Sequence, residues 1–396
     1  MPLSQGRGNL MNRLKIAIVT KEWPPAIYGG AGVHVVELTQ AIRAVDGTTV
    51  DVHCFGGPRE DAFGYSTPSQ FIDANPAVQA LATDLEIASH LGGVDVVHSH
   101  TWYANMAGHI GALQHKIPHI VSAHSLEPLR PWKSEQLGGG YAISSWAEKT
   151  AYEAAAAIIA VSDGMRADVL AAYPRIDPEK VVTIGNGVDT TRFAPNHDSS
   201  VAAKFGVTGP YAIFVGRITR QKGLAHLLRA WKDVPDDYGL VLAAGSPDEE
   251  GIGNEVAELI DELQITRANI WWIKDMLPHK DLTAMLTGAE LFICPSVYEP
   301  LGIVNLEAMA CETAVLASRV GGIPEVVAHK VTGELVDYVG DAVPFEKSLT
   351  ESITRLMSQP ELLKKYGAAG RMRTVNEFGW DEVAAATVAL YRRVIA

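Results

Sequence analysis

Short runs of apolar and β-branched residues alternate along this chain with amphipathic segments, and this alternation constrains the fold more than any other feature. The runs resemble strands buried on both faces, which is typical of a parallel sheet covered by helices. Their order with the helical segments predicts βαβ units. In the first half of the chain, the strand-like runs are Lys15–Thr20, Val50–Cys54, Val94–His98, His119–Ala123 and Ala157–Val161.

The alternation stops near Asp189 and starts again after a stretch of turn-forming residues. Residues 193–210 contain two prolines, two glycines and a polar run, which indicates a linker region. A second series of strand-like runs follows, at Tyr211–Val215, Leu240–Ala243, Ile270–Ile273, Leu291–Cys294, Ala314–Ala317 and Glu334–Val336. The sequence therefore predicts two Rossmann-like, doubly wound parallel-sheet domains. We place them at residues 14–195 and 208–378, after a loose tail at 1–13.

Ligands of such sheets bind outside the carboxyl ends of the strands, so the active site is expected in a cleft that the two domains face. Charge narrows the choice of ligand. The chain has 33 Lys and Arg against 46 Asp and Glu, a net charge of −13, so neither nucleic acid nor an anionic membrane surface is an expected partner. Any anionic ligand must be bound by a local basic pocket.

Hydropathy and cysteine usage exclude further classes of protein. The longest apolar run, Ala154–Val161, has eight residues, whereas a membrane-spanning helix needs about 20. The three cysteines are scattered and form no Cys-x-x-Cys pair, which argues against a disulfide framework or a zinc cluster. These features predict a cytoplasmic protein.

A glycine-rich loop follows the first predicted strand. Gly29, Gly30 and Gly32 lie just before a helix that is expected to begin near Val33. Backbone without side chains can approach a phosphate closely, and a helix N-terminus offers unpaired N–H groups. The alternative is a tight turn between strand and helix that binds nothing.

A basic cluster follows the first strand of the second domain. Arg217, Arg220 and Lys222 come after the run Tyr211–Val215 and before a helix. Arg217 and Lys222 are expected to hold a diphosphate from two sides by charge-assisted hydrogen bonds. The alternative is solvated charge on a surface loop.

Two glutamates flank the start of another helix in the second domain. Glu299 precedes the helix and Glu307 lies on it; eight residues correspond to about 80° of net rotation, so both carboxylates can face one side. Such a pair can bind sugar hydroxyls and stabilise positive charge at an anomeric carbon. Backbone N–H groups near Leu301, Gly302 and Ile303 would point at a leaving phosphate. The alternative is that the glutamates only stabilise the helix dipole.

Histidines mark the ends of two strands in the first domain. His98 and His100 share a strand face, but no third ligand lies near them in the chain, so hydrogen-bonded structural histidines are expected rather than a metal site. No Asp-x-Asp motif occurs, so no metal and no metal-bridged diphosphate are predicted.

His124 ends the next strand and is followed by Ser125, Arg130 and Lys133. This segment is expected to bind the second substrate. The alternatives are a structural hydrogen bond for His124 and a solvated loop for the two cations.

In their order along the chain, these motifs resemble the retaining glycosyltransferases of the two-domain GT-B fold, of the family-four type. More narrowly, the chain is similar to the actinobacterial glycogen synthase/α-maltose-1-phosphate synthase group. The segments that carry this similarity are Lys21–Pro25, Tyr28–His34, His98–Tyr103, Ala123–Lys133 and Pro295–Asn305. One departure is the first glycine loop, which reads Ile27–Ala31 where larger bacterial glycogen synthases carry Lys-Thr-Gly-Gly-Leu.

The resemblance implies ADP-glucose as the donor and an α-1,4 bond in the product, with no cofactor. The acceptor would be glucose 1-phosphate or the end of an α-1,4-glucan, and Arg130 and Lys133 favour the phosphorylated sugar. The first domain would serve the acceptor, the second would bind the nucleotide sugar, and a C-terminal helix over residues 380–396 would cross back to the first. UDP-glucose as donor and a homodimer both stay open.

The resemblance also implies roles for individual residues. Glu299 would contact the donor glucose and Glu307 the ribose hydroxyls, while Arg217 and Lys222 neutralise the departing diphosphate. Gly29 and Gly30 would contact the diphosphate. His124 would bind the donor sugar, or its backbone carbonyl would stabilise the oxocarbenium ion.

Other functions on the same scaffold remain open, because a fold does not fix its chemistry. A nucleotide-sugar 2-epimerase, another UDP-sugar transferase and a glucan phosphorylase are alternative enzymes. A sugar-nucleotide sensor would keep the binding residues without turnover.

Overall fold

The computed structural model describes residues 13–27, 29–131 and 133–396. The chain divides into two compact units, one ending at Gly185 and completed by Trp380–Ala396, the other spanning Asn186–Gly379. The tail expected over residues 1–13 lies outside the described residues except for Arg13. No helix among the described residues is both long enough and apolar enough to cross a bilayer.

Unit 1 is built on a seven-stranded sheet in which every pairing is parallel, in the order β3-β2-β1-β4-β5-β6-β7. The strands are β1 Leu14–Thr20, β2 Thr48–Phe55, β3 Phe63–Tyr65, β4 Val96–His100, β5 His119–Ala123, β6 Ala157–Ala160 and β7 Val181–Thr183. The helices are α1 Gly30–Ala44, α2 Pro76–Ser89, α3 Trp102–His115, α4 Lys133–Leu137, α5 Gly140–Ala154, α6 Asp163–Ala172 and α15 Trp380–Ile395, with short 3₁₀ turns at η1 Ser69–Phe71, η2 Glu127–Leu129 and η3 Pro178–Lys180.

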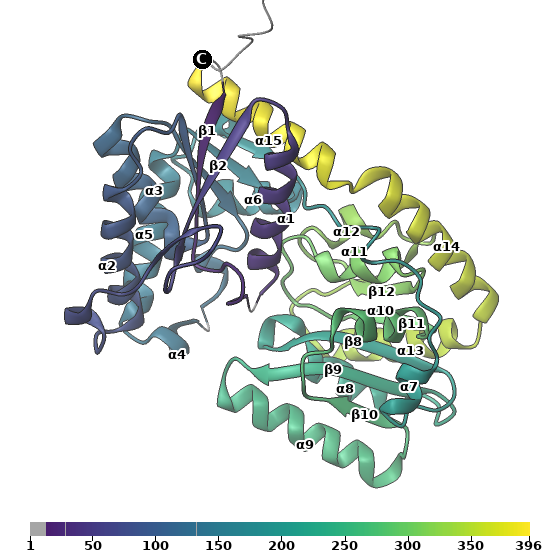
Figure 1. Ribbon diagram of the computed structural model, residues 1–396. Helices are drawn as coiled ribbons and strands as arrows, with labels where there is room; N and C mark the ends of the chain where they lie inside the picture. The colour runs from purple at the N-terminus through teal and green to yellow at the C-terminus, as the bar shows by residue number, and fades with distance from the viewer. Residues whose placement is uncertain (1–12, 28, 132) are drawn as a thin grey trace, which may run out of the picture. The chain divides into compact units, whose positions relative to one another are not determined.

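Alternate residues of β1 show how this sheet is covered on both faces. Ile16 and Ile18 pack in a buried cluster with residues of α1 and α15, whereas Ala17 and Val19 pack in another with residues of α2 and α3. Figure 1 shows α1 and α15 on one side of the sheet and α2, α3 and α5 on the other. The apolar runs of the sequence are thus the centre of a helix–sheet–helix sandwich.

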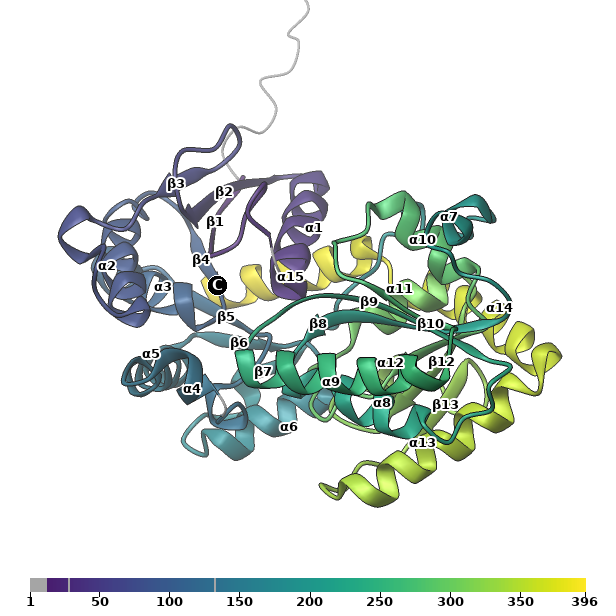
Figure 2. The same ribbon diagram turned by 90° about the horizontal axis from the view of Figure 1, so that it is seen from below.

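Unit 2 contains a six-stranded parallel sheet in the order β10-β9-β8-β11-β12-β13. The strands are β8 Tyr211–Ile218, β9 Gly239–Pro247, β10 Ile270–Ile273, β11 Leu291–Cys294, β12 Ala314–Ser318 and β13 Gly333–Val336. The helices are α7 Ser200–Lys204, α8 Leu224–Trp231, α9 Glu250–Thr266, α10 His279–Thr287, α11 Ile303–Ala310, α12 Ile323–Val326, α13 Ala342–Met357 and α14 Pro360–Glu377, with a 3₁₀ turn at η4 Arg220–Lys222. Figure 2 shows α8, α9 and α13 along one side of this sheet.

Both sheets have the strand order of a Rossmann fold, in which the chain starts in the middle and reverses direction once across the sheet. The predicted pair of Rossmann-like, doubly wound parallel sheets is therefore confirmed. The reversal lies between β1 and β4 in unit 1 and between β8 and β11 in unit 2. Loops that leave the carboxyl ends of these neighbouring strands splay apart there, which leaves room for a ligand.

Candidate active site

In unit 2, the loops that follow β8 and β11 meet at the point where the strand order reverses. Gly223 has a φ of 65°, and a Cβ added there would lie 2.0 Å from the carbonyl oxygen of Pro295. The N–H of Val297 donates to the carbonyl of Gln221 over 2.9 Å. The two loops therefore touch through their backbones, and only glycine fits at the contact.

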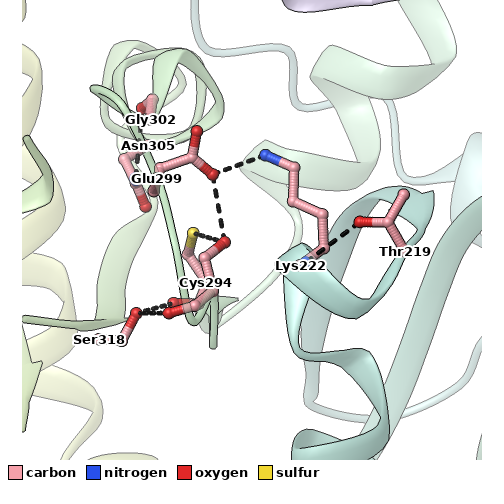
Figure 3. A network of polar contacts seen from close by, with 8 residues as sticks. Thr219, Lys222, Cys294, Glu299, Gly302, Asn305 and Ser318 are labelled. Atoms are coloured by element: carbon pink, nitrogen blue, oxygen red, sulfur yellow. Dashed lines mark hydrogen bonds and ion pairs between the residues drawn. The ribbon is translucent and has the colours of Figure 1, made fainter. Parts of the chain in front are cut away.

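This contact brings Lys222 and Glu299 together. The Nζ of Lys222 lies 2.6 Å from Oε2 of Glu299, which also accepts a hydrogen bond from Oγ of Ser296 at 3.1 Å (Figure 3). Both side chains are largely buried. Burial lowers the pKa of Lys222, but the Glu299 carboxylate and the neighbouring Cys294 raise it by more than burial lowers it. The pKa of Lys222 therefore lies above its ordinary value. Lys222 is thus a charged ammonium group at neutral pH.

The N-terminus of α11 lies beside Glu299. Gly302 precedes the helix with a φ of 94°, and a Cβ on it would come within 2.4 Å of Nδ2 of Asn305 and 3.3 Å of Cγ of Glu299. Leu301 precedes this glycine, and Ile303 is the first residue of the helix. The first turn of a helix carries N–H groups without intrahelical partners, which attract anions.

Glu307 lies on α11 and is half-buried. Burial raises its pKa to about 7, although the nearby charges of Lys222 and Arg192 act in the opposite direction. Glu299 and Glu307 both interact electrostatically with Lys222. A carboxyl group with a pKa near 7 can both donate and accept hydrogen bonds, and either protonation state can bind a hydroxyl group.

Two carboxylates that the sequence analysis missed hold the arginines of this half-site. Nη1 of Arg217 lies 2.5 Å from Oδ1 of Asp248, and Nε of Arg220 lies 3.4 Å from Oε2 of Glu249. Asp248 and Glu249 directly follow β9, the neighbour of β8 in the sheet. That adjacency is the signal that could have found them, because parallel strands end at the same edge.

In unit 1, the glycine loop packs around a buried carboxylate. The N–H of Gly29 donates to Oε2 of Glu22 at 3.0 Å, and a Cβ on Gly32 would lie 2.5 Å from the same oxygen. Gly30 is the first residue of α1. Glu22 therefore accepts a hydrogen bond from one of the N–H groups that the sequence analysis assigned to a phosphate. Its carboxylate also leaves no room for a side chain at position 32.

A histidine cluster lies at the carboxyl ends of β4 and β5. Nδ1 of His98 lies 2.6 Å from the Tyr391 hydroxyl and Nε2 lies 2.8 Å from Oγ of Ser122, so His98 is a hydrogen-bonded structural histidine, as predicted. His100 instead faces His124, with Nδ1 and Nε2 3.0 Å apart. Burial lowers the pKa of His124 to about 4, so its ring is neutral at pH 7.

The segment after His124 carries the residues that are predicted to bind the second substrate. Nη1 of Arg130 donates to Oγ of Ser125 at 3.1 Å, and Lys133 begins α4. The intervening 3₁₀ turn is anchored by a buried network that the sequence analysis missed: the N–H of Glu127 and the Tyr173 hydroxyl both donate to Oε1 of Glu148, at 2.9 and 2.5 Å. The network fixes the segment that carries the two cations.

The structure thus gathers the predicted residues into two groups. Arg217, Lys222, Glu299, Glu307 and residues 301–303 lie together in unit 2, whereas the glycine loop, His124 and the segment from Ser125 to Lys133 lie in unit 1. The cleft between the domains stays a prediction. The first group offers cations and a helix N-terminus to an anion, and the second offers neutral imidazoles and two cations.

Two protein-family models match this chain, one in each half. Residues 28–192 match the model of glycosyltransferase family 4, and residues 198–373 match that of glycosyl transferases group 1. The chain is 50% identical over 389 residues to the α-maltose-1-phosphate synthase of Mycolicibacterium smegmatis, which covers 97% of this chain and all of that protein.

Solved structures share the fold over nearly the whole chain. The sucrose-phosphate synthase of Thermosynechococcus elongatus superposes with a TM-score of 0.81 at 24% identity, covering 96% of this chain and 99% of the other. The Anabaena protein HepE in complex with UDP-glucose gives a TM-score of 0.78 at 17% identity, with 96% and 100% covered. The chain therefore belongs to the GT-B glycosyltransferases of the family-four type, in the group that contains the α-maltose-1-phosphate synthases.

Proposed function

We propose that this glycosyltransferase moves a glucosyl unit from ADP-glucose to glucose 1-phosphate, with retention of configuration, to give α-maltose 1-phosphate. The non-reducing end of an α-1,4-glucan is the second acceptor within the same proposal. The single observation that carries it is the Lys222–Glu299 pair, 2.6 Å apart beside the N-terminus of α11. The name of the M. smegmatis relative supports the choice of acceptor.

Unit 2 would bind the donor. Lys222 and Arg217 neutralise the diphosphate together with the first turn of α11, while Glu299 binds hydroxyls of the glucose and Glu307 those of the ribose. The Asp248 carboxylate holds the guanidinium of Arg217 in place. A diphosphate carries more charge than one carboxylate, so it competes with Asp248 for this guanidinium. Because Asp248 already orients the guanidinium, little reorganisation is needed when the diphosphate binds.

The transfer would proceed on one face of the sugar. The bond between the anomeric carbon and the β-phosphate oxygen breaks, and its electron pair leaves with the diphosphate. The acceptor hydroxyl oxygen then bonds to the anomeric carbon, and its proton passes to the departing phosphate oxygen. Lys222 and the helix N-terminus stabilise the charge that develops on the leaving group, with no metal ion.

Unit 1 would bind the acceptor. Arg130 and Lys133 suit the phosphate of glucose 1-phosphate, whereas a neutral glucan end needs hydroxyl partners and aromatic surfaces more than cations. The buried network of Glu127, Glu148 and Tyr173 supports this assignment, because it holds the segment in one conformation before the acceptor arrives.

Product analysis tests the proposal. The protein is incubated with ADP-glucose or UDP-glucose, each with glucose 1-phosphate or glycogen, in the presence of EDTA. The expected product is α-maltose 1-phosphate, formed from ADP-glucose with one equivalent of ADP released. Extension of glycogen alone would reject the phosphorylated acceptor, and ADP release that does not depend on an acceptor would reject transfer to either.

A further inference from the structure

Three histidines from three different elements of unit 1 place their ring nitrogens next to one another. His34 lies on α1, His100 ends β4 and His124 follows β5. One nitrogen from each lies within 4.8 Å of the other two. The ring of His34 meets that of His124 edge-on, with centroids 4.7 Å apart. The cluster therefore lies at the carboxyl edge of the sheet, where ligands of this fold bind.

Hydrogen bonds do not fully account for this cluster. His98, on the same strand as His100, has both ring nitrogens hydrogen-bonded, to Tyr391 and Ser122. By contrast, Nε2 of His100 is buried and has no hydrogen-bond partner among the described residues. The unpartnered Nε2 can hold the ring proton, which leaves Nδ1, the nitrogen beside His124, with a lone pair for a ligand.

We propose that His34, His100 and His124 form a three-nitrogen site for Zn²⁺. Imidazole nitrogen is a preferred ligand of zinc, with Zn–N bonds of about 2.0–2.1 Å, which place tetrahedral ligand atoms about 3.3 Å apart. Nδ1 of His100 and Nε2 of His124 are already 3.0 Å apart, and their shared hydrogen bond opens when the ring that donates it moves its proton to its other nitrogen. A rotation of His34 that moves its nitrogen by about 1.5 Å or less completes the third corner.

Three protein ligands leave the fourth position of the zinc ion to water. The site has one consequence that rests on the proposed function: because His124 is assigned there to the donor sugar, bound Zn²⁺ inhibits transfer. Binding of the metal itself does not depend on that assignment. Mg²⁺ and Ca²⁺ prefer oxygen ligands, so they do not occupy the site.

Metal binding is measured on the full-length, metal-free protein by isothermal titration with Zn²⁺ and by the visible absorption of the Co²⁺ derivative. We expect one Zn²⁺ per chain and the intense bands of tetrahedral cobalt. His34→Gln and His100→Gln should each weaken binding at least about tenfold. His197→Gln, which changes an exposed histidine of unit 2, is the matched control and should leave binding unchanged.

X-ray absorption of the zinc-loaded wild-type protein provides a test that needs no variant. Three imidazole nitrogens in the first shell support the site, whereas thiolate ligands, no stoichiometric binding, or equal binding by wild-type and His34→Gln protein overturn it. Activity separates this proposal from the proposed function. Protein that makes α-maltose 1-phosphate but binds no Zn²⁺ refutes only the metal site, and protein that binds Zn²⁺ through the histidines without that activity refutes only the transfer.

Discussion

Lys222 and Glu299 form an ion pair whose value for stability is small. Their side chains are 20% and 8% exposed, so both charges lose most of their hydration. The attraction between two such charges roughly offsets that desolvation, and buried pairs of this kind contribute little net stability. The pair instead holds an ammonium group at the N-terminus of α11, where an arriving phosphate finds it already oriented.

Replacement of this ammonium group should slow the chemical step. Lys222→Ala is expected to lower kcat by about 10²-fold or more, because one preorganised contact to the leaving diphosphate is lost. The measurement is steady-state kinetics with ADP-glucose and glucose 1-phosphate. Lys232→Ala, which breaks the exposed ion pair with Glu262, is the control and should keep the wild-type kcat. An unchanged kcat in Lys222→Ala would remove Lys222 from the mechanism.

Glu148 gives unit 1 a stability that depends on pH. Burial raises its pKa to about 8, partly opposed by the Tyr173 hydroxyl, whereas the unfolded value is about 4.3. Between these values the folded chain binds a proton that the unfolded chain has released, so the stability from this group falls as pH rises from about 4.3 to about 8.

Glu148→Gln should remove this dependence, because an amide resembles the protonated carboxyl group. Urea unfolding from about pH 5 to about pH 8 should show the wild type losing stability relative to the variant as the pH rises. Comparison with the variant cancels the contribution of other titrating groups. Glu153→Gln, on the same helix and paired with Lys149, should follow the wild type. Parallel curves for wild-type and Glu148→Gln protein would contradict the assigned protonation state.

At the scale of elements, the two loops of unit 2 that carry the donor residues are held together through Gly223. This residue combines a left-handed backbone with a close approach to Pro295. Gly209 has a similar φ of 72°, but a Cβ added to it would meet no atom within 4 Å. The two glycines therefore separate the cost of the backbone conformation from the cost of the contact.

Gly223→Ala should therefore cost more than Gly209→Ala. Both substitutions lower the free energy of unfolding by about 1–2 kcal/mol, because alanine must adopt a left-handed backbone conformation. Gly223→Ala must in addition push the two loops apart. We expect Gly223→Ala to lower the free energy of unfolding of unit 2 more than Gly209→Ala does. Only Gly223→Ala should lower kcat. Thermal unfolding and steady-state kinetics measure both effects, and equal behaviour of the two variants would show that the loop contact has no role.

At the scale of the whole molecule, the last segment of the chain completes the first unit. Val388 and Tyr391 of α15 are buried in the same cluster as Ile16 and Ile18 of β1. The Tyr391 hydroxyl also lies 2.6 Å from Nδ1 of His98. Unit 1 is thus built from two pieces of chain with the whole of unit 2 inserted between them.

A chain that ends at Gly379 should therefore lose the fold of unit 1 and keep that of unit 2. Removal of α15 exposes the apolar face of α1 and leaves His98 without one of its partners. Calorimetry should show the loss of one unfolding transition, and limited proteolysis should leave a fragment that begins near Asn186. A chain that lacks only the last two residues is the control. Protection of unit 1 in the shortened chain would contradict this division.

Local patterns predicted most of each sheet. The strands at Ile270–Ile273 and Leu291–Cys294 have the predicted bounds, because the run of apolar residues begins and ends where the strand does. The edge strands β3 and β7 have three residues each and were not predicted, since such short runs carry little periodicity. Helix α13 begins at Ala342, because the Asp341 side chain caps it by accepting a hydrogen bond from the N–H of Val343.

The sequence by itself determined the two Rossmann-like sheets and the segments that carry charge at their edges, because strand, helix and turn preferences act over a few neighbouring residues. Only the tertiary structure decided which polar side chains meet. Asp248 pairs with Arg217, 31 residues away in the chain, and His34 lies beside His100 and His124. The physical reason is the strand order, which brings loops far apart in the chain to one edge of a sheet and places their side chains near one another.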